Sequence, residues 1–104
     1  MSTIDRTAAL EIVKASLQEV FVQNAMPAPD AVSEDTVLVG KDAVLDSLGV
    51  VSLIVEVEQR VEAEHNVSVT LANDKAMSQR NSPFRTVGVL TDHVVAMVAE
   101  ESAA

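Results

Sequence analysis

Few side chains of this sequence are suited to catalysis. The 104 residues include no cysteine and two histidines, which excludes disulfides, thiolate zinc sites and thiol chemistry by a side chain. Ser47, His65 and either Asp92 or His93 can be written as a catalytic triad, but His65 lies about 27 Å from Ser47 along one predicted helix. The acidic residues do not have the spacing of a metal-binding loop. We therefore expect that the chain is not an enzyme and has no metal site.

Among the hydroxyl-bearing residues, Ser47 has the position that is most informative about function. It follows Asp46 and directly precedes an apolar run, so the pair is expected to begin a helix. A helix start has backbone N–H groups without intrahelical partners and the positive end of the dipole, and both stabilise an anion. A phosphate ester on Ser47 would therefore be favourable. The simpler interpretation is that Asp46 or Ser47 is an N-cap, which contributes about 1 kcal/mol.

The predicted helix that follows, residues 47–65, has more apolar residues than one packed face requires. Seven of the ten residues from Leu48 to Val57 are apolar. One stripe predicts the core face and consists of Val50, Leu53, Ile54, Val57 and Val61. A second stripe begins apolar and becomes acidic, and it consists of Leu48, Val51, Val55, Glu58 and Glu62. A helix buried on two sides would also explain the pattern, but the acidic end better suits a surface that a partner binds.

Three further helices are predicted around this one. Periodicity places them at about residues 4–22, 74–80 and 86–100, with Thr3 as the cap of the first. Asn66 is expected to end the helix 47–65 in a left-handed turn, before a short extended stretch over 67–71. The long connection 23–45 contains apolar residues that should pack on the bundle, namely Val37, Leu38, Val44 and Leu45. The chain is thus predicted as one all-α domain, a small four-helix bundle with a long loop between helices one and two.

The charge of the chain limits its partners. Sixteen acidic residues against seven Lys and Arg give a net charge of −9, which argues against direct binding of nucleic acid or an anionic membrane. Residues 42–64 hold six acids and one base, Arg60, and so carry −5 of this charge. No apolar run is long enough to span a bilayer, and the first residues are unlike a signal peptide. We expect a cytoplasmic monomer without membrane insertion.

Several of these features occur together in one protein family. Residues 44–49 are VLDSLG, the two-stripe helix follows, residues 67–69 are extended, and residues 86–90 are TVGVL. In this order they resemble the acyl carrier protein family, whose Asp-Ser-Leu signature matches Asp46, Ser47 and Leu48. The resemblance covers most of the chain from Val37 to Val98, and residues 4–22 match in length and pattern.

The resemblance implies a four-helix carrier in which Ser47 bears 4′-phosphopantetheine from coenzyme A, with Asp46 and Leu48 beside it. Acyl groups would travel as thioesters on this arm, whose thiol explains why the chain needs no cysteine. The implied partners are a phosphopantetheinyl transferase and acyl-loading and acyl-transferring enzymes with basic docking patches. They would bind the second stripe, which consists of Leu48, Val51, Val55, Glu58 and Glu62.

Some positions differ from the carriers of fatty acid synthesis. Gly49 and Ser52 stand where those carriers often have acids, and the segment 71–85 is longer and more basic than usual. The stretch Leu-Asp-Ser-Leu-Gly is also similar to D-alanyl and other aminoacyl carriers. These differences favour a specialised carrier in a lipid, polyketide, polysaccharide-modifying or related pathway. The alternative from another class is a non-carrier adaptor, an acidic bundle that binds a basic partner helix.

Overall fold

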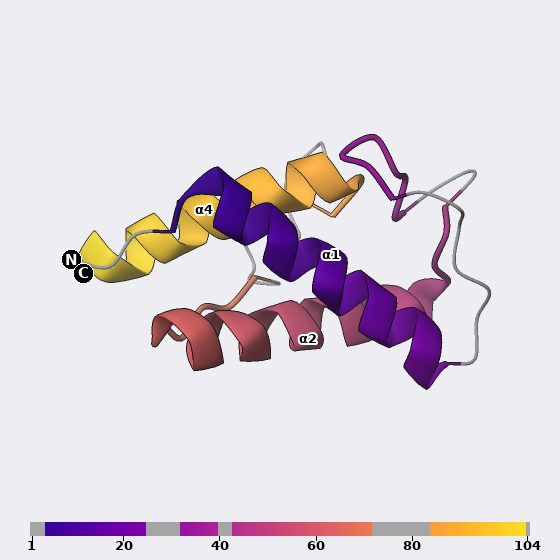
Figure 1. The fold of residues 1–104 in the computed structure, drawn as a ribbon, viewed down its shortest axis with the longest axis horizontal. Coiled ribbons are helices and arrows are strands. Elements are labelled where there is room, and N and C mark those ends of the chain that lie inside the picture. Colours follow the sequence, from indigo (N-terminus) through magenta and orange to yellow (C-terminus); the bar gives the residue numbers. More distant parts are fainter. Residues whose placement is uncertain (1–3, 25–31, 40–42, 72–83, 104) are drawn as a thin grey trace.

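The computed structural model describes residues 4–24, 32–39, 43–71 and 84–103. This part of the chain contains three helices and no strand: α1 is Arg6–Gln23, α2 is Ser47–His65 and α4 is Val87–Ala103 (Figure 1). An isolated antiparallel bridge joins Val37 and Thr86. The predicted all-α class and three of the predicted helices are confirmed: α2 has the predicted bounds, and the ends of α1 and α4 shift by one to three residues. The fourth predicted helix, 74–80, lies outside the described residues, so the four-helix count stays a prediction.

The ends of α1 and α2 are fixed by local hydrogen bonds. Asp5 caps α1, and its side chain accepts a 2.7 Å hydrogen bond from Ala8 N. The prediction of Thr3 as this cap is wrong, because the helix begins at Arg6 and Asp5 is the residue that precedes it. At the end of α2, Asn66 has φ 58° and ψ 36°, which is the predicted left-handed turn.

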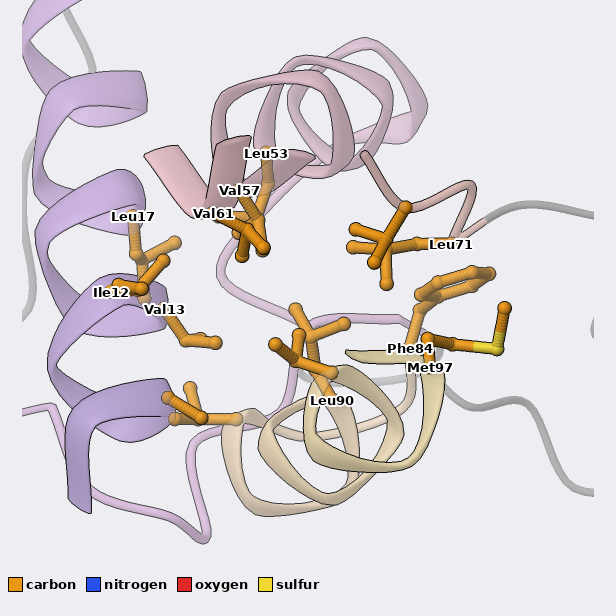
Figure 2. Close-up of a cluster of buried hydrophobic side chains, with 14 of the residues drawn as sticks. Ile12, Val13, Leu17, Leu53, Val57, Val61, Leu71, Phe84, Leu90 and Met97 are labelled. Carbon is orange, nitrogen blue, oxygen red and sulfur yellow. The ribbon is translucent and has the colours of Figure 1, made fainter. Parts of the chain in front are cut away.

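The core lies where α1 crosses the other two helices. α1 packs against both α2 and α4. Figure 2 shows Ile12, Val13 and Leu17 of α1 on one side of this core, and Leu71, Phe84 and Met97 on the opposite side, between α2 and α4. Val13, Leu17, Val57, Val61 and Leu90 have no exposed surface. Burial of such side chains is the main force that holds a small domain together.

The described part of the long connection packs on the bundle, as the sequence predicted, and it contacts the start of α4. Leu38 is fully buried and Leu45 is 7% exposed. The backbone carbonyls of Glu34 and Thr36 accept hydrogen bonds from Gly88 N at 2.9 Å and Val87 N at 3.0 Å. These two N–H groups belong to the first turn of α4, which has no intrahelical acceptors for them. The connection therefore supplies acceptors for N–H groups in the first turn of α4.

None of the described helices is long and apolar enough to cross a membrane.

Arg6 ties the same connection to two helices. Its guanidinium forms an ion pair with Glu34 and another with Asp92 of α4, in which Arg6 Nε lies 2.8 Å from Asp92 Oδ1. The hydrogen bond from Arg6 lowers the pKa of Glu34 below its ordinary value of 4.5. The same contacts raise the pKa of Arg6 further. Residues far apart in the sequence thus meet in one charged cluster on the surface.

The Glu34 ion pair predicts a loss of stability in acid. The pKa of Glu34 is lower in the folded state than its ordinary value of 4.5. The ion pair therefore adds to the free energy of unfolding above pH 4.5, and this contribution is lost as the pH falls through the lower pKa of the folded state. Urea unfolding followed by circular dichroism at several pH values between about 5.5 and 3 should show this decline in the wild type. The decline should be shallower in Arg6→Gln and unchanged in Arg85→Gln, whose exposed side chain lies outside the cluster. Identical pH profiles for Arg6→Gln and the wild type would contradict the prediction.

Candidate functional site

The start of α2 is held in place by three neighbouring residues. Asp46 is the N-cap, and its carboxylate accepts a 2.7 Å hydrogen bond from Gly49 N. Leu45, directly before it, is buried against the first turn. A Cβ atom on Gly49 would lie 3.1 Å from Leu45 Cδ2 and 3.2 Å from Leu45 Cβ, so glycine permits this close packing. Ser47 is therefore the first residue of a helix whose start is well anchored.

The residues on either side of Ser47 and the backbone of the first turn define its chemical environment. Its neighbours Asp46 and Leu48 are both exposed. The N–H of Leu48 has no acceptor among the residues that the structure describes. This donor and the positive end of the α2 dipole are the groups that stabilise an anion at a helix start. The end of α2 at Ser47 thus has backbone electrostatics that stabilise an anion.

An apolar strip runs along α2 from this point. We define it as Leu48, Val51 and Val55, whose exposed fractions are 66%, 61% and 44%. The opposite stripe forms the core face, since Leu53, Val57 and Val61 are buried and Val50 and Ile54 pack beside them. The strip is therefore not a second buried side of the helix. Exposed apolar side chains that adjoin one another commonly mark a surface that another molecule covers.

The acidic end of the second stripe has an internal partner that sequence reasoning missed. Glu58 Oε2 accepts a 2.8 Å hydrogen bond from Leu71 N, and Glu62 Oε2 accepts one of 3.3 Å from Ser68 Oγ. Both partners lie on the segment 67–71, in which Val67, Val69 and Leu71 are buried and alternate with exposed Ser68 and Thr70. The hydrogen bonds of Glu58 and Glu62 thus hold this segment against α2. No local pattern indicates such a contact, because Glu58 and Leu71 are thirteen residues apart.

His93 of α4 contacts Leu71 as well, through the backbone carbonyl of that residue. Its Nε2 lies 2.8 Å from the carbonyl oxygen of Leu71, so Nε2 carries the proton and donates. Its ring also meets the ring of Phe84 edge to face, with centroids 5.7 Å apart. Side chains from α2 and α4 therefore bind both the N–H and the carbonyl of Leu71.

The structure does not assemble the catalytic triad that could be written from the sequence. Ser47 and His65 stand at opposite ends of α2, and the carboxylate of Asp92 pairs with Arg6. Within the described ranges, no group of three His, Asp or Glu residues could hold a metal ion.

One open hollow of about 480 Å³ lies away from the predicted site. It is lined by Ala8, Glu11, Ile12, Ala15, Arg60, Glu64 and His65. None of the predicted site residues is among them. Its lining residues on α2 are thirteen or more positions from Ser47, which corresponds to about 20 Å along the helix. The hollow is therefore remote from the start of α2.

Comparison with protein-family models, with curated proteins and with solved structures gives no match to this chain.

The hydrogen bond between Glu58 and Leu71 predicts a matched pair of stability effects. In Glu58→Ala the buried N–H of Leu71 loses its acceptor, so the free energy of unfolding should fall by about 1–3 kcal/mol. Glu64→Ala changes an exposed glutamate on the same helix and should shift it by about 0.5 kcal/mol or less. Urea unfolding measures both values, and hydrogen exchange of the Leu71 amide should quicken in the first variant alone. Equal effects of the two variants would contradict this role of Glu58.

Proposed function

We propose that this protein is a carrier that holds acyl or aminoacyl groups as thioesters on a 4′-phosphopantetheine arm attached to Ser47. It delivers these groups to the enzymes of a biosynthetic pathway, such as one for fatty acids, other lipids or polyketides. The observation that carries the proposal is the position of Ser47 as the first residue of α2, where the helix N-terminus meets the exposed apolar strip.

The residues at the start of α2 fit the attachment of such an arm. A phosphodiester on Ser47 would lie near the N–H of Leu48, and the helix dipole favours its negative charge. The carboxylate of Asp46 already accepts the bond from Gly49 N, which fixes the turn that Ser47 begins. When bound, the arm supplies the thiol that the chain lacks. The chain itself positions the arm and presents the surface beside it.

The strip and the charge of α2 support the partners of this function. A phosphopantetheinyl transferase would attach the arm, and acyl-loading and acyl-transferring enzymes would follow. Basic patches on these enzymes would be attracted by the −5 charge of residues 42–64, to which Glu58 and Glu62 contribute. Encounters of this kind are brief, as transfer between several enzymes requires. In this proposal the carrier is a cytoplasmic monomer.

The decisive test is the chemistry of Ser47. Incubation of the purified protein with coenzyme A and a phosphopantetheinyl transferase should raise its intact mass by one phosphopantetheine arm. Ser47→Ala should show no gain, because it lacks the hydroxyl that receives the arm. Ser52→Ala, which removes a hydroxyl from the next turn of the same helix, should be modified like the wild type.

The outcome of this test separates the carrier from an adaptor. No mass gain with several transferases would refute the carrier and favour the adaptor, which needs the apolar strip but not the Ser47 hydroxyl. Asp46→Asn keeps a good N-cap without the charge, whereas Asp46→Ala removes both. The rates at which these two variants gain the arm show whether the N-cap or the negative charge of Asp46 promotes the modification of Ser47. The intact mass of the protein from its native cell would identify an acyl or aminoacyl cargo.

A further inference from the structure

The open hollow between α1 and α2 has an apolar part and a charged part. The apolar part belongs to one face of α1, where the lining residues Ala8, Ile12 and Ala15 are four and three positions apart. Ile12 is buried in the core, whereas each alanine carries a single methyl group and leaves space beside α2. The hollow of about 480 Å³ thus exists because small residues occupy a place where the two helices pack.

Arg60 brings unpaired hydrogen-bond donors into the lining of the hollow. Its Nε lies 3.2 Å from a carboxylate oxygen of Glu56, and its side chain is half-buried. The terminal nitrogens of the guanidinium have no acceptor among the residues that the structure describes. These N–H groups form a planar fork, which matches the two oxygens of a carboxylate. The lining therefore has a group that can bind the anionic end of a ligand.

Carboxylates without partners line the same hollow. Glu64 lies one turn after Arg60 on α2, yet Arg60 pairs with Glu56 instead. Glu11 of α1 supplies a second exposed carboxylate, and within the described ranges neither Glu11 nor Glu64 has an ion pair or hydrogen bond. His65, which also lines the hollow, ends α2, and the negative end of the helix dipole favours a cation there. The lining therefore has groups that can bind a cationic end as well.

We infer that this hollow is a second binding site, and that its ligand is a small zwitterion, an aliphatic α-amino acid. The carboxylate of the ligand binds the guanidinium of Arg60. Its ammonium group lies against Glu11 and Glu64, and its aliphatic side chain covers Ala8 and Ala15. A molecule with one charge satisfies one part of the lining and leaves the opposite charge of the protein without a partner, so it binds more weakly.

The volume and position of the hollow agree with such a ligand. Its 480 Å³ lie within the range of small-molecule sites, about 300–1,000 Å³. Because the hollow is open, the ligand stays partly hydrated and exchanges rapidly. Its contacts come from both helices, so binding stabilises the packing of α1 against α2. The site does not rest on the proposed function, since its lining does not include the start of α2.

Titration with three related molecules tests the inference. Valine carries both charges, isobutylamine is valine without the carboxylate, and isovalerate is valine without the ammonium group. Backbone amide signals in NMR spectra of the full chain at neutral pH report where each molecule binds. Valine should shift the signals of residues 8–15 and 60–65 saturably. It should also bind at least about tenfold more tightly than either analogue, because each analogue loses one charge-assisted contact.

Single substitutions assign the two ends of the ligand. Arg60→Gln should weaken the binding of valine and isovalerate about tenfold but not that of isobutylamine. Glu64→Gln should weaken the binding of valine and isobutylamine but not that of isovalerate. Ala15→Leu fills the hollow and should abolish the binding of all three. Glu100→Gln removes an exposed carboxylate of α4 that does not line the hollow, and this matched control should bind valine like the wild type. Circular dichroism verifies that each variant is folded.

Three results would overturn the inference. The first is the absence of a saturable shift with valine, and the second is equal affinity of the wild type for valine and isobutylamine. The third is a Glu100→Gln variant that loses as much affinity for valine as Arg60→Gln. None of these results bears on the attachment of phosphopantetheine to Ser47. The intact-mass measurement tests that attachment without valine, so the two proposals can fail separately.

Discussion

The packing of α2 against α1 is the contact on which the rest of the site depends. Leu53, Val57 and Val61 are buried in the core where the two helices meet, and this fixes the rotation of α2 about its axis. With 3.6 residues per turn, that rotation necessarily directs Leu48, Val51 and Val55 away from the core. The exposure of the strip therefore follows from the burial of the opposite face. One apolar contact thus both stabilises the domain and determines which side of α2 is exposed.

The sequence was informative wherever the determinants are local. The period of apolar residues predicted α1, α2 and α4, and short-range rules predicted the N-terminus of α2 at Asp46 and its end at Asn66. It was not informative for contacts between distant residues. Glu58 with Leu71, His93 with Leu71 and Arg6 with Glu34 are 13, 22 and 28 residues apart. Such pairs leave no periodic signal, because only the packing of the helices brings them together.

Gly49, the residue after Leu48, illustrates how close packing restricts the residue type at one position. It approaches Leu45 so closely that a Cβ atom would lie 3.1 Å from Leu45 Cδ2 and 3.2 Å from Leu45 Cβ. A residue with a Cβ atom here would require Leu45 to shift by a few tenths of an ångström. The residue type at this position is thus coupled to the packing of Leu45, which precedes the helix.

The size of the apolar strip bears on the choice between a carrier and an adaptor. Three side chains over eight residues extend about 10 Å along a helix about 10 Å wide, so the strip covers on the order of 100 Å². A stable complex usually buries about 800 Å² on each partner. An adaptor would need much more surface than this strip to hold its partner for long. A carrier needs the opposite, since each enzyme must release it after one transfer, and a small strip beside Ser47 is suited to such brief contact.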